Sequence, residues 1–419
     1  MMSQAFYTGI SGLKNYSTGI DVIANNLANI STVGFRGYSA EFASLFEDTL
    51  QETSTIHSDN VGGGVRVQTS GMNNSQGTLM IGDRSTDLAI LGDGWFGIIG
   101  EKEETIYTRD GAFSIDANAD LVTADGYYVL GTLANNISEE NVLTKQLGET
   151  PLGDVNTQEK LRFPQTLTFP PQPSTKVNFL GNIGVGYEPV AMGAAVVDAQ
   201  NNRNDLKLVF TKDPQQTPPG TQYNVVATLK SPDGQTLYDT QSGRVAFDER
   251  GALISSTLST INNNGTDVSI NLGTGFDGLI SIDTPKTSYS SSVDGTIGGE
   301  LIEYTINENA DIIASFSNGE QSSIGKVAVY HFQNNQGLSR VSGARFQESA
   351  NSGKAQFYKD TNGQNVIGTT VVNYRLESSN VDIAVGLTEL IILQRSYDAN
   401  SKSITTADQM MQKALEMDA

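Results

Sequence analysis

The sequence predicts a mainly β protein with α-helical termini, in which the two terminal helices pair as a coiled coil. Three observations carry this prediction. Apolar side chains recur at every seventh position at both ends of the chain, the region between the ends is rich in short β-type runs, and all eleven prolines lie in one central window. Together they predict paired terminal helices, a discontinuous β-domain and a second β-domain inserted into it.

A seven-residue apolar repeat at each end indicates helices that need a helical partner. That spacing is the seam of a coiled coil, whose apolar stripe has to face another helix. Residues 381–416 would form a rod of about 50 Å, with Ser379 as a possible cap and Asp382 in the first turn. A stripe of that length requires the N-terminal helix, neighbouring subunits, or both. The expected helix-contact residues are Phe6, Leu13, Ile20, Ile23, Leu27 and Ile30 at one end, and Ile383, Leu390, Tyr397, Ile404 and Met411 at the other.

The prolines divide the β-rich middle of the chain. All of them fall between Pro151 and Pro285, and proline is confined to strand edges, loops and turns. This predicts an inserted outer β-domain at 146–285. The other expected parts are a terminal helical domain of residues 1–30 plus 381–419, a connector at 31–72 that includes Gly62, Gly63 and Gly64, and an inner β-domain of residues 73–145 plus 286–380.

A short turn motif occurs three times in the β-rich region. Each copy has an apolar residue, an Asx residue, a turn and an apolar pair, beginning at Ser114, Ala246 and Thr305. Asp and Asn side chains hydrogen-bond to their own backbone and tolerate left-handed geometry, so we interpret these copies as turns between strands. The spacing is irregular, which favours a recurring hairpin over a solenoid repeat.

Composition excludes several classes of function. Lys and Arg number 26 and Asp and Glu number 47, which gives a formal net charge of −21. Such a surface repels nucleic acid and anionic lipid. Cysteine is absent, so disulfides and thiolate metal sites are excluded. No apolar run approaches the roughly 20 residues of a membrane-spanning helix, and the N-terminus lacks the pattern of a cleaved signal peptide.

No motif in the chain argues strongly for catalysis or metal binding. Residues 92–97 match G-x-G-x-x-G, but a dinucleotide site needs this loop to open a helix, and a tight turn between strands is the better interpretation. The stretch from Asp116 to Asp120 begins like a calcium loop but lacks the later glycine and glutamate. The two histidines, His57 and His331, form no recognisable triad. We therefore predict no catalytic, cofactor or metal site.

Asn25, Asn26 and Asn29 stand together near the end of the N-terminal helix. Asparagine is a weak helix former because it competes for backbone hydrogen bonds. The cluster indicates either hydrogen bonding to another helix or a frayed helix end, and the sequence favours neither.

Two long motifs resemble the signatures of bacterial flagellar rod and hook proteins. The N-terminal motif runs from Ala24 to Arg36 and the C-terminal motif from Ser379 to Lys402. Shorter similarities at residues 87–96, 107–113, 125–127 and 334–338 extend the resemblance over about residues 3–135 and 300–417. The matching signature residues are Asn25, Asn26, Asn29, Gly34, Phe35, Asn380, Asp382, Gln394, Arg395 and Asn400.

The resemblance implies a non-enzymatic subunit, exported through the flagellar type III route without a cleaved signal peptide and located in the extracellular flagellum. It would polymerise beneath a cap into a hollow curved tube, a flexible joint that transmits torque from rod to filament. Its implied partners are copies of itself, the hook cap, the distal rod and hook–filament junction proteins, and the export apparatus. Nucleic acid and membrane insertion are not expected.

Two alternatives stay open at this stage. One is a distal rod protein of the same family, although rod proteins generally lack a large insertion, so the proline-bounded segment favours the hook. The other is a secreted β-rich glycan-binding protein or glycosidase, because the many acidic residues offer countless carboxylate pairs. Formation of tubular polymers by the purified protein would distinguish a hook protein from this second class.

Overall fold

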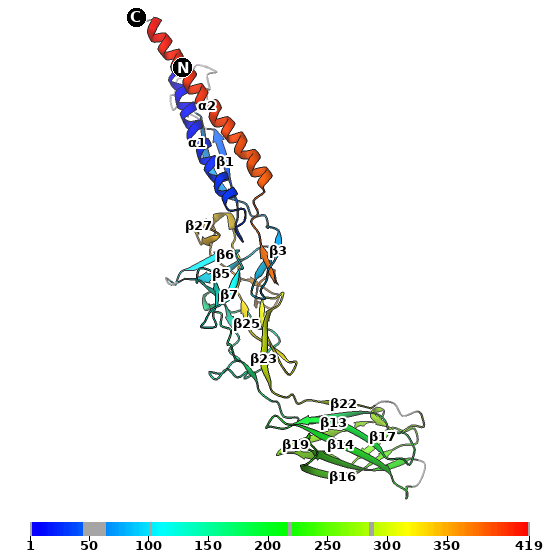
Figure 1. The fold of residues 1–419 in the computed structure, drawn as a ribbon. Coiled ribbons are helices and arrows are strands. Elements are labelled where there is room, and N and C mark those ends of the chain that lie inside the picture. The colour runs from blue at the N-terminus through cyan, green and yellow to red at the C-terminus, as the bar shows by residue number, and fades with distance from the viewer. Residues whose placement is uncertain (1, 45–63, 101–102, 217–219, 285–288, 418–419) are drawn as a thin grey trace.

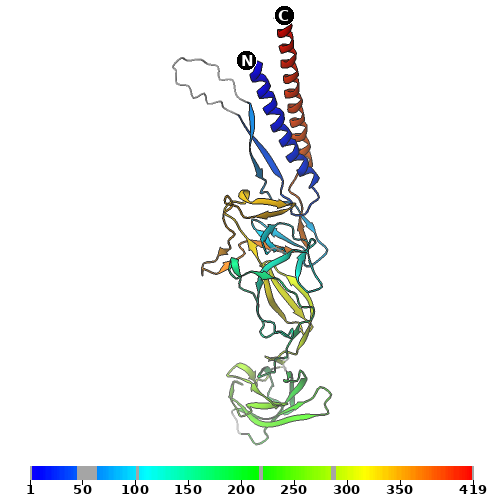
Figure 2. The same cartoon turned by 90° about the vertical axis from the view of Figure 1, so that its left-hand side faces the viewer.

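The computed structural model describes residues 2–44, 64–100, 103–216, 220–284 and 289–417. The chain is elongated, with two long helices at one end and two β units following one another toward the other end (Figures 1 and 2). The predicted fold class, mainly β with a helix at each terminus, is confirmed.

The two helices are antiparallel. Helix α1 spans Met2–Ala28 and helix α2 spans Ile383–Met417, and both chain termini lie at the same end of the molecule (Figure 1). The C-terminal end of α2 extends beyond the start of α1. A hairpin of β1 (Tyr38–Ser44) and β2 (Val65–Met72) lies beside α1, as Figure 2 shows. Of the predicted connector at 31–72, Gly62 and Gly63 lie outside the described residues.

The β unit next to the helices, here called the proximal unit, is built from two separated parts of the chain. Its main sheet has the strand order β11-β23-β24-β25-β9-β5-β6-β28-β27. Between β4 and β5 the glycine-rich stretch forms a turn and opens no helix, as predicted. The strands are β3 (Leu79–Ile81), β4 (Leu88–Leu91), β5 (Trp95–Ile99), β6 (Thr105–Thr108), β7 (Phe113–Ile115), β8 (Leu121–Thr123), β9 (Tyr128–Leu133), β10 (Glu159–Lys160), β11 (Thr168–Phe169), β23 (Gly299–Ile306), β24 (Asp311–Phe316), β25 (Gln321–Val327), β26 (Val329–Tyr330), β27 (Ser339–Ser342), β28 (Arg345–Gln347), β29 (Tyr358–Lys359), β30 (Asn365–Val366), β31 (Thr370–Asn373) and β32 (Arg375–Glu377), with short 3₁₀ helices at Val155–Thr157 and Asn335–Gly337.

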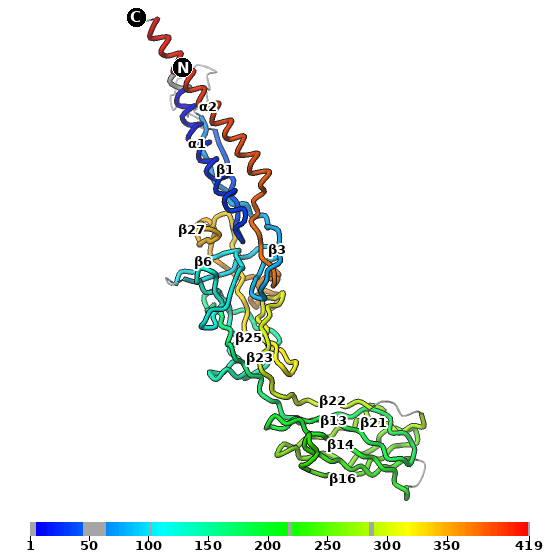
Figure 3. The backbone as a smooth tube through the Cα atoms, viewed as in Figure 1, coloured from blue at the N-terminus to red at the C-terminus, as the bar shows by residue number. Residues whose placement is uncertain are grey.

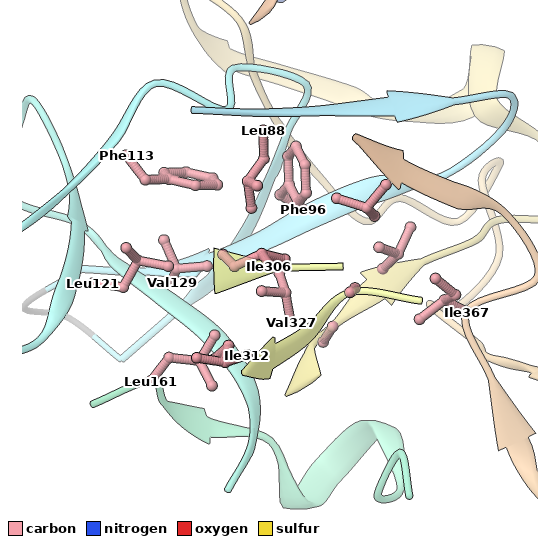
Figure 4. Close-up of a cluster of buried hydrophobic side chains, with 14 of the residues drawn as sticks. Leu88, Phe96, Phe113, Leu121, Val129, Leu161, Ile306, Ile312, Val327 and Ile367 are labelled. Carbon is pink, nitrogen blue, oxygen red and sulfur yellow. The ribbon is translucent and has the colours of Figure 1, made fainter. Parts of the chain in front are cut away.

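One hydrophobic core joins both parts of the proximal unit. Phe96 and Phe113, from the first part, share it with Ile312 and Val327 from the second, and Figure 4 shows these side chains turned toward one another. Phe96 and Phe113 meet edge to face, with ring centroids 5.2 Å apart, an arrangement that aromatic quadrupoles favour. Burial of this shared core links segments that lie far apart in the sequence.

The second β unit, here called the distal unit, has two sheets around a separate core. One sheet is the meander β13-β14-β15-β16-β17, and the other has the order β18-β19-β12-β21-β20, with β22 paired to β12. Inward residues alternate with exposed ones along β14 and β15, as expected when one face of a sheet is buried. The strands are β12 (Lys176–Asn182), β13 (Val190–Val197), β14 (Arg203–Lys212), β15 (Thr221–Lys230), β16 (Leu237–Phe247), β17 (Leu253–Ser256), β18 (Thr260–Asn263), β19 (Thr266–Asn271), β20 (Gly273–Thr274), β21 (Asp277–Ile280) and β22 (Ser290–Val293).

The predicted boundaries of the inserted domain were 146 and 285. The chain passes from the proximal core to the distal core, and back again, later than these two positions. Leu161 and Phe169 belong to the proximal core, whereas Val177 begins the distal core and Val293 still packs against it. Two connections join the units (Figure 3), bridged to each other at Gln172 and Thr296. The proline-rich segment before residue 170 therefore packs as extended chain on the proximal unit, and the domain division itself stays a prediction.

The recurring Asx motif forms the same turn each time. The Oδ1 atoms of Asp116, Asp248 and Asn307 each accept hydrogen bonds from the backbone N–H groups two and four residues further on. Two further copies, at Asp198 and Asp360, have the same bonds. In all five the residue three places after the Asx is left-handed, and it is alanine, asparagine or glycine. The interpretation as turns between strands is confirmed.

Candidate assembly site at the helical end

Small residues let α1 and α2 approach closely. A Cβ atom added at Gly9 would lie 2.6 Å from Cγ1 of Ile404, and one added at Gly12 would lie 2.5 Å from Oδ1 of Asn400. Near the other end of the pair, a Cβ atom at Gly386 would lie 3.1 Å from a methyl group of Leu27. The antiparallel contact therefore interlocks glycines with larger side chains of the facing helix.

The β1–β2 hairpin is attached to α1 by side-chain hydrogen bonds to its backbone. Asn15 accepts from Val67 N at 2.9 Å and donates to Val65 O at 2.6 Å. Asn26 accepts from Tyr38 N at 3.0 Å and donates to Tyr38 O at 2.6 Å. Each amide thus satisfies a donor and an acceptor at the edge of the hairpin.

The three clustered asparagines have different roles. Asn26 bonds to a strand, which neither sequence interpretation anticipated. Asn29 donates to the carbonyl oxygen of Asn25 at 2.9 Å and accepts from the Thr32 hydroxyl at 3.2 Å. Asn25 and Asn29 therefore close the end of α1, as the helix-end interpretation expected.

Past α1 the chain passes directly against the proximal unit. Gly34 has a φ of +66°, and a Cβ atom there would overlap the backbone of Arg109 and Asp110. Its N–H donates to Glu377 O at 2.7 Å. Only glycine fits such a backbone approach in a left-handed conformation. Phe35 follows, 1% exposed, beneath the Arg340 guanidinium at 4.6 Å from the ring centroid.

One buried carboxylate joins both ends of the chain to the proximal core. Glu377 lies 2.8 Å from Arg36 and 3.2 Å from Arg109, and all three side chains are at most 4% exposed. Glu377 also accepts from Gly77 N at 2.9 Å. Burial lowers the pKa of Arg109 to about 10, against the opposing charge of Glu377, and burial lowers the pKa of Arg36 as well. Both arginines are still cationic at neutral pH, so the carboxylate offsets two buried charges. We call Arg36, Arg109 and Glu377 the junction triad.

Asn380 and Asp382 organise the start of α2. Asn380 accepts from Gly37 N at 2.8 Å and donates to Asn73 O and Ser75 O, both at 2.8 Å. Asp382 accepts from Ala384 N at 2.7 Å and from Val385 N at 3.1 Å, which is the geometry of a helix cap. The expectation that Ser379 caps the helix is wrong, because α2 begins only at Ile383 and the Ser379 hydroxyl accepts from Val381 N instead.

Much of α2 carries exposed apolar side chains. Ile383, Leu387 and Ile391 follow one another at four-residue spacing and are 54%, 47% and 57% exposed. We call these three residues the outer stripe. Residues four apart lie on one face of a helix, and this face differs from the side that carries Gly386, Asn400 and Ile404. Within the described chain the outer stripe is therefore an apolar surface open to solvent.

The predicted helix-contact residues are distributed over several environments. Ile23 is buried, whereas Tyr397 and Met411 are exposed. Phe6, Leu13, Ile20, Leu27, Leu390 and Ile404 are half-buried, and Ile383 belongs to the outer stripe. Ile30 lies beyond the end of α1. Of the signature residues in α2, Asn400 meets α1, while Gln394 and Arg395 are exposed.

Sequence reasoning missed the closest contacts in this region. The α1 glycines were not recognised as helix-contact positions, although Gly12 and Gly19 repeat the seven-residue spacing of the apolar stripe. Arg109 lies in the similar stretch at 107–113, but neither that stretch nor the surroundings of Glu377 indicated that the two side chains pair, because they lie far apart in the sequence.

The described residues contain neither a cluster of metal-binding carboxylate and histidine side chains nor a membrane-spanning helix. No group of three or more His, Asp or Glu side chains in that part is placed to hold a metal ion. No described helix is both long and apolar enough to cross a membrane.

Three family models match the chain. They are described as flagella basal body rod protein, matching residues 6–36, flagellar hook protein FlgE/F/G D1 domain, matching 89–168, and flagellar basal body rod FlgEFG protein C-terminal, matching 372–417. Each of the three matched segments contains one member of the junction triad.

Similar proteins match over nearly the whole chain. The flagellar hook protein FlgE of Borreliella burgdorferi is 28% identical, with 99% of this chain and 100% of that protein covered. FlgE of Escherichia coli is 27% identical, covering 97% and 98%, and FlgE of Brucella suis is 29% identical, covering 96% of each. The solved structure of Helicobacter pylori flagellar hook protein FlgE2 has the same fold, with a TM-score of 0.54 and 17% identity, covering 71% of this chain and 100% of that chain.

An antiparallel terminal helix pair with an open apolar face, on a body of β units, defines a structural subunit built to assemble. The family models at both termini and in the proximal unit, together with hook proteins that are similar over nearly the full chain, support a flagellar hook protein.

Proposed function

We propose that this chain is the structural subunit of a bacterial flagellar hook. Copies polymerise through their terminal helices into a hollow curved tube that serves as a flexible joint and transmits torque from rod to filament. The observation that carries this proposal is the outer stripe of α2, because exposed contiguous apolar surface marks an interaction site. Full-length similarity to hook proteins supports it, and favours neither a distal rod protein nor a glycan-binding protein or glycosidase.

In this tube the terminal helices, residues 1–30 plus 381–419, form the inner layer. The connector at 31–72 and the proximal unit, in place of the expected inner β-domain at 73–145 plus 286–380, surround it, and the distal unit, the core of the expected insertion at 146–285, lies outermost. Separate hydrophobic cores in the proximal and distal units support a division into independent layers. Outer β units meet through smaller polar contacts that can shift as the tube bends.

The subunit acts outside the cell, after export through the flagellar type III route without a cleaved signal peptide. Its partners in assembly are the hook cap, the distal rod and the hook–filament junction proteins. The absence of cysteine and the strongly acidic composition suit an exported, soluble subunit.

A truncation tests the proposal. Deleting residues 381–419 removes α2 but leaves both β cores intact, so the shortened chain is expected to stay folded and monomeric at concentrations at which the full chain forms sedimentable tubes. Circular dichroism and unfolding curves check that the β units remain. Tubes from the truncated chain would contradict the proposal.

A further inference from the structure

A buried carboxylate without a cationic partner stands at one end of the distal unit. Asp198, in the turn between β13 and β14, is 0% exposed, and no ion pair in the described part of the chain involves it. Burial raises the pKa of Asp198, but hydrogen bonds from Asn202 and Asn264 outweigh this effect and hold that pKa below its usual range. The group is therefore an anion at neutral pH that is held by hydrogen bonds, without a cation beside it in the described part of the chain.

Amide side chains surround this carboxylate. Oδ2 of Asp198 accepts from the amides of Asn264 at 2.8 Å, Asn202 at 3.0 Å and Asn204 at 3.4 Å. The Asn264 amide also donates to Oε1 of Gln200 at 2.6 Å. Each asparagine side-chain amide can flip by rotation about χ2, which places its oxygen where its nitrogen was. Side-chain oxygens are thus available at alternate positions 198, 200, 202 and 204 and from the facing turn.

Two atoms of this cluster have no partner despite complete burial. Asn204 and Asn263 are both 0% exposed, yet Oδ1 of Asn204 and Nδ2 of Asn263 make no hydrogen bond. Such groups are rare in folded proteins, and each one destabilises the folded state. The turn itself does not explain them, because the same Asx turn forms at Asp116 and Asp360, where neighbouring amides are exposed.

We propose that this cluster binds a calcium ion, and we call it the Asp198 site. The carboxylate of Asp198 and the amide oxygens of Asn202, Asn204, Asn264 and Gln200 supply the ligands, and water completes the shell from the exposed side. Oxygen-only donors select a hard cation, and an irregular, mostly neutral set suits calcium better than magnesium. The ion offsets the buried charge and gives Oδ1 of Asn204 a partner. This proposal departs from the sequence expectation of no metal site and does not depend on the proposed function.

The Asp198 site lies where the distal unit meets its two connections. Next to it, Asn201 accepts from Gly298 N at 2.7 Å in one connection. Val197 donates from N to Ser174 Oγ at 2.8 Å, and its O accepts from Ser174 N at 2.9 Å, in the other. Ordering this turn therefore stiffens the attachment of the distal unit to the proximal unit.

Calcium titration of the full-length chain, freed of divalent metals, tests the proposal by calorimetry and thermal unfolding. A site with one carboxylate is expected to bind one ion with a Kd of about 10⁻⁴–10⁻³ M. At ten times that Kd the melting temperature of the distal unit should rise by roughly 5 °C. Asp198→Asn, which keeps the shape and removes the charge, should weaken binding at least about tenfold.

Asp360→Asn is the matched control, because it changes the same turn without a surrounding amide cluster, and it should bind calcium like the wild type. Asn264→Ala, a partly exposed change, should also weaken binding and serves if Asp198→Asn fails to fold. Absence of any calcium response in the wild type, an unchanged response in both Asp198→Asn and Asn264→Ala, or an equal response to magnesium would overturn the proposal.

Discussion

The Arg36 guanidinium lies 2.8 Å from the Glu377 carboxylate, although the two residues come from opposite ends of the chain. The same carboxylate lies 3.2 Å from Arg109 in the proximal core. Because Gly34 and Asn380 add hydrogen bonds across the same place, both terminal helices leave the β unit from one rigid, buried junction. We therefore expect a torque applied to the helices to pass through the junction triad into the proximal unit.

Glu377→Gln should strongly destabilise the junction. The substitution removes the carboxylate that pairs with both buried arginines, Arg36 and Arg109, which costs about 3–5 kcal/mol. Chemical denaturation at pH 7 measures the loss, with Glu389→Gln at an exposed α2 position as control. A loss below about 1 kcal/mol, the range of a surface pair, would show that the triad is not a structural link.

Gly12→Ala should loosen the helix pair even though alanine is the better helix former by about 1 kcal/mol. The new methyl group meets the Asn400 side chain, so hydrogen exchange in α1 should become faster. The double variant Gly12→Ala with Asn400→Ala should recover protection, since the shorter side chain makes room. Ser17→Ala, at an exposed position of α1, is the control. Slower exchange in the single variant would contradict the close contact.

The proximal unit should lose stability as the pH rises above about 10, the unperturbed pKa of tyrosine. Burial raises the pKa of Tyr107, Tyr304 and Tyr330 above that value. These groups therefore keep their protons in the folded state while the unfolded chain loses them, so their contribution to stability is complete below pH 10 and falls as the pH increases. Stability measured from pH 8 to 11.5 should fall less steeply in Tyr330→Phe. Tyr187→Phe, at an exposed tyrosine, should leave the slope unchanged, and equal slopes in all three proteins would refute the explanation.

Two glycines in equivalent Asx turns should respond differently to alanine. At Gly251 a Cβ atom would overlap Ile282 and the carbonyl of Ser281, whereas at Gly363 it meets open space. Gly363→Ala should cost only the left-handed penalty of about 1–2 kcal/mol. Gly251→Ala should cost at least about 1 kcal/mol more, from overpacking. Thermal unfolding compares the two, and similar losses would argue against the packing at Gly251.

The periodic parts of this fold could be predicted from the sequence. The seven-residue apolar repeat predicted both helices. The Asx turns could be predicted because an Asp or Asn is followed at fixed spacing by a residue that tolerates left-handed geometry. The pairing of the helices was predicted, but their closest contacts were not, since Gly9 and Gly12 have no side chain to mark an interface and matter only through the facing Ile404 and Asn400. The start of α2 was placed too early because Ser379 and Asp382 are both good caps, and only the path of the chain decides between them.

Contacts between residues far apart in the chain could not be predicted from the sequence, for a physical reason. The junction triad unites charges whose mutual distance depends on the whole fold, and the family-like stretch around Arg109 does not indicate which carboxylate that arginine meets. The proline window pointed to an insertion, but proline marks extended chain as well as loops, so residues such as Phe163 and Phe169 pack in the proximal core. The contacts between subunits could not be predicted either, because they depend on how other copies of the chain are placed.

Electron microscopy of the concentrated full-length chain beside Ile391→Asp tests the central claim most directly. Ile391 lies in the outer stripe, 57% exposed, so an aspartate there leaves the single chain folded but places a charge in the proposed contact between copies. The wild type should form hollow tubes, as should Ile254→Asp, which carries the same exchange at an exposed isoleucine of the distal unit. Ile391→Asp should give folded chains and no tubes. Normal tubes from Ile391→Asp would contradict assembly through the outer stripe.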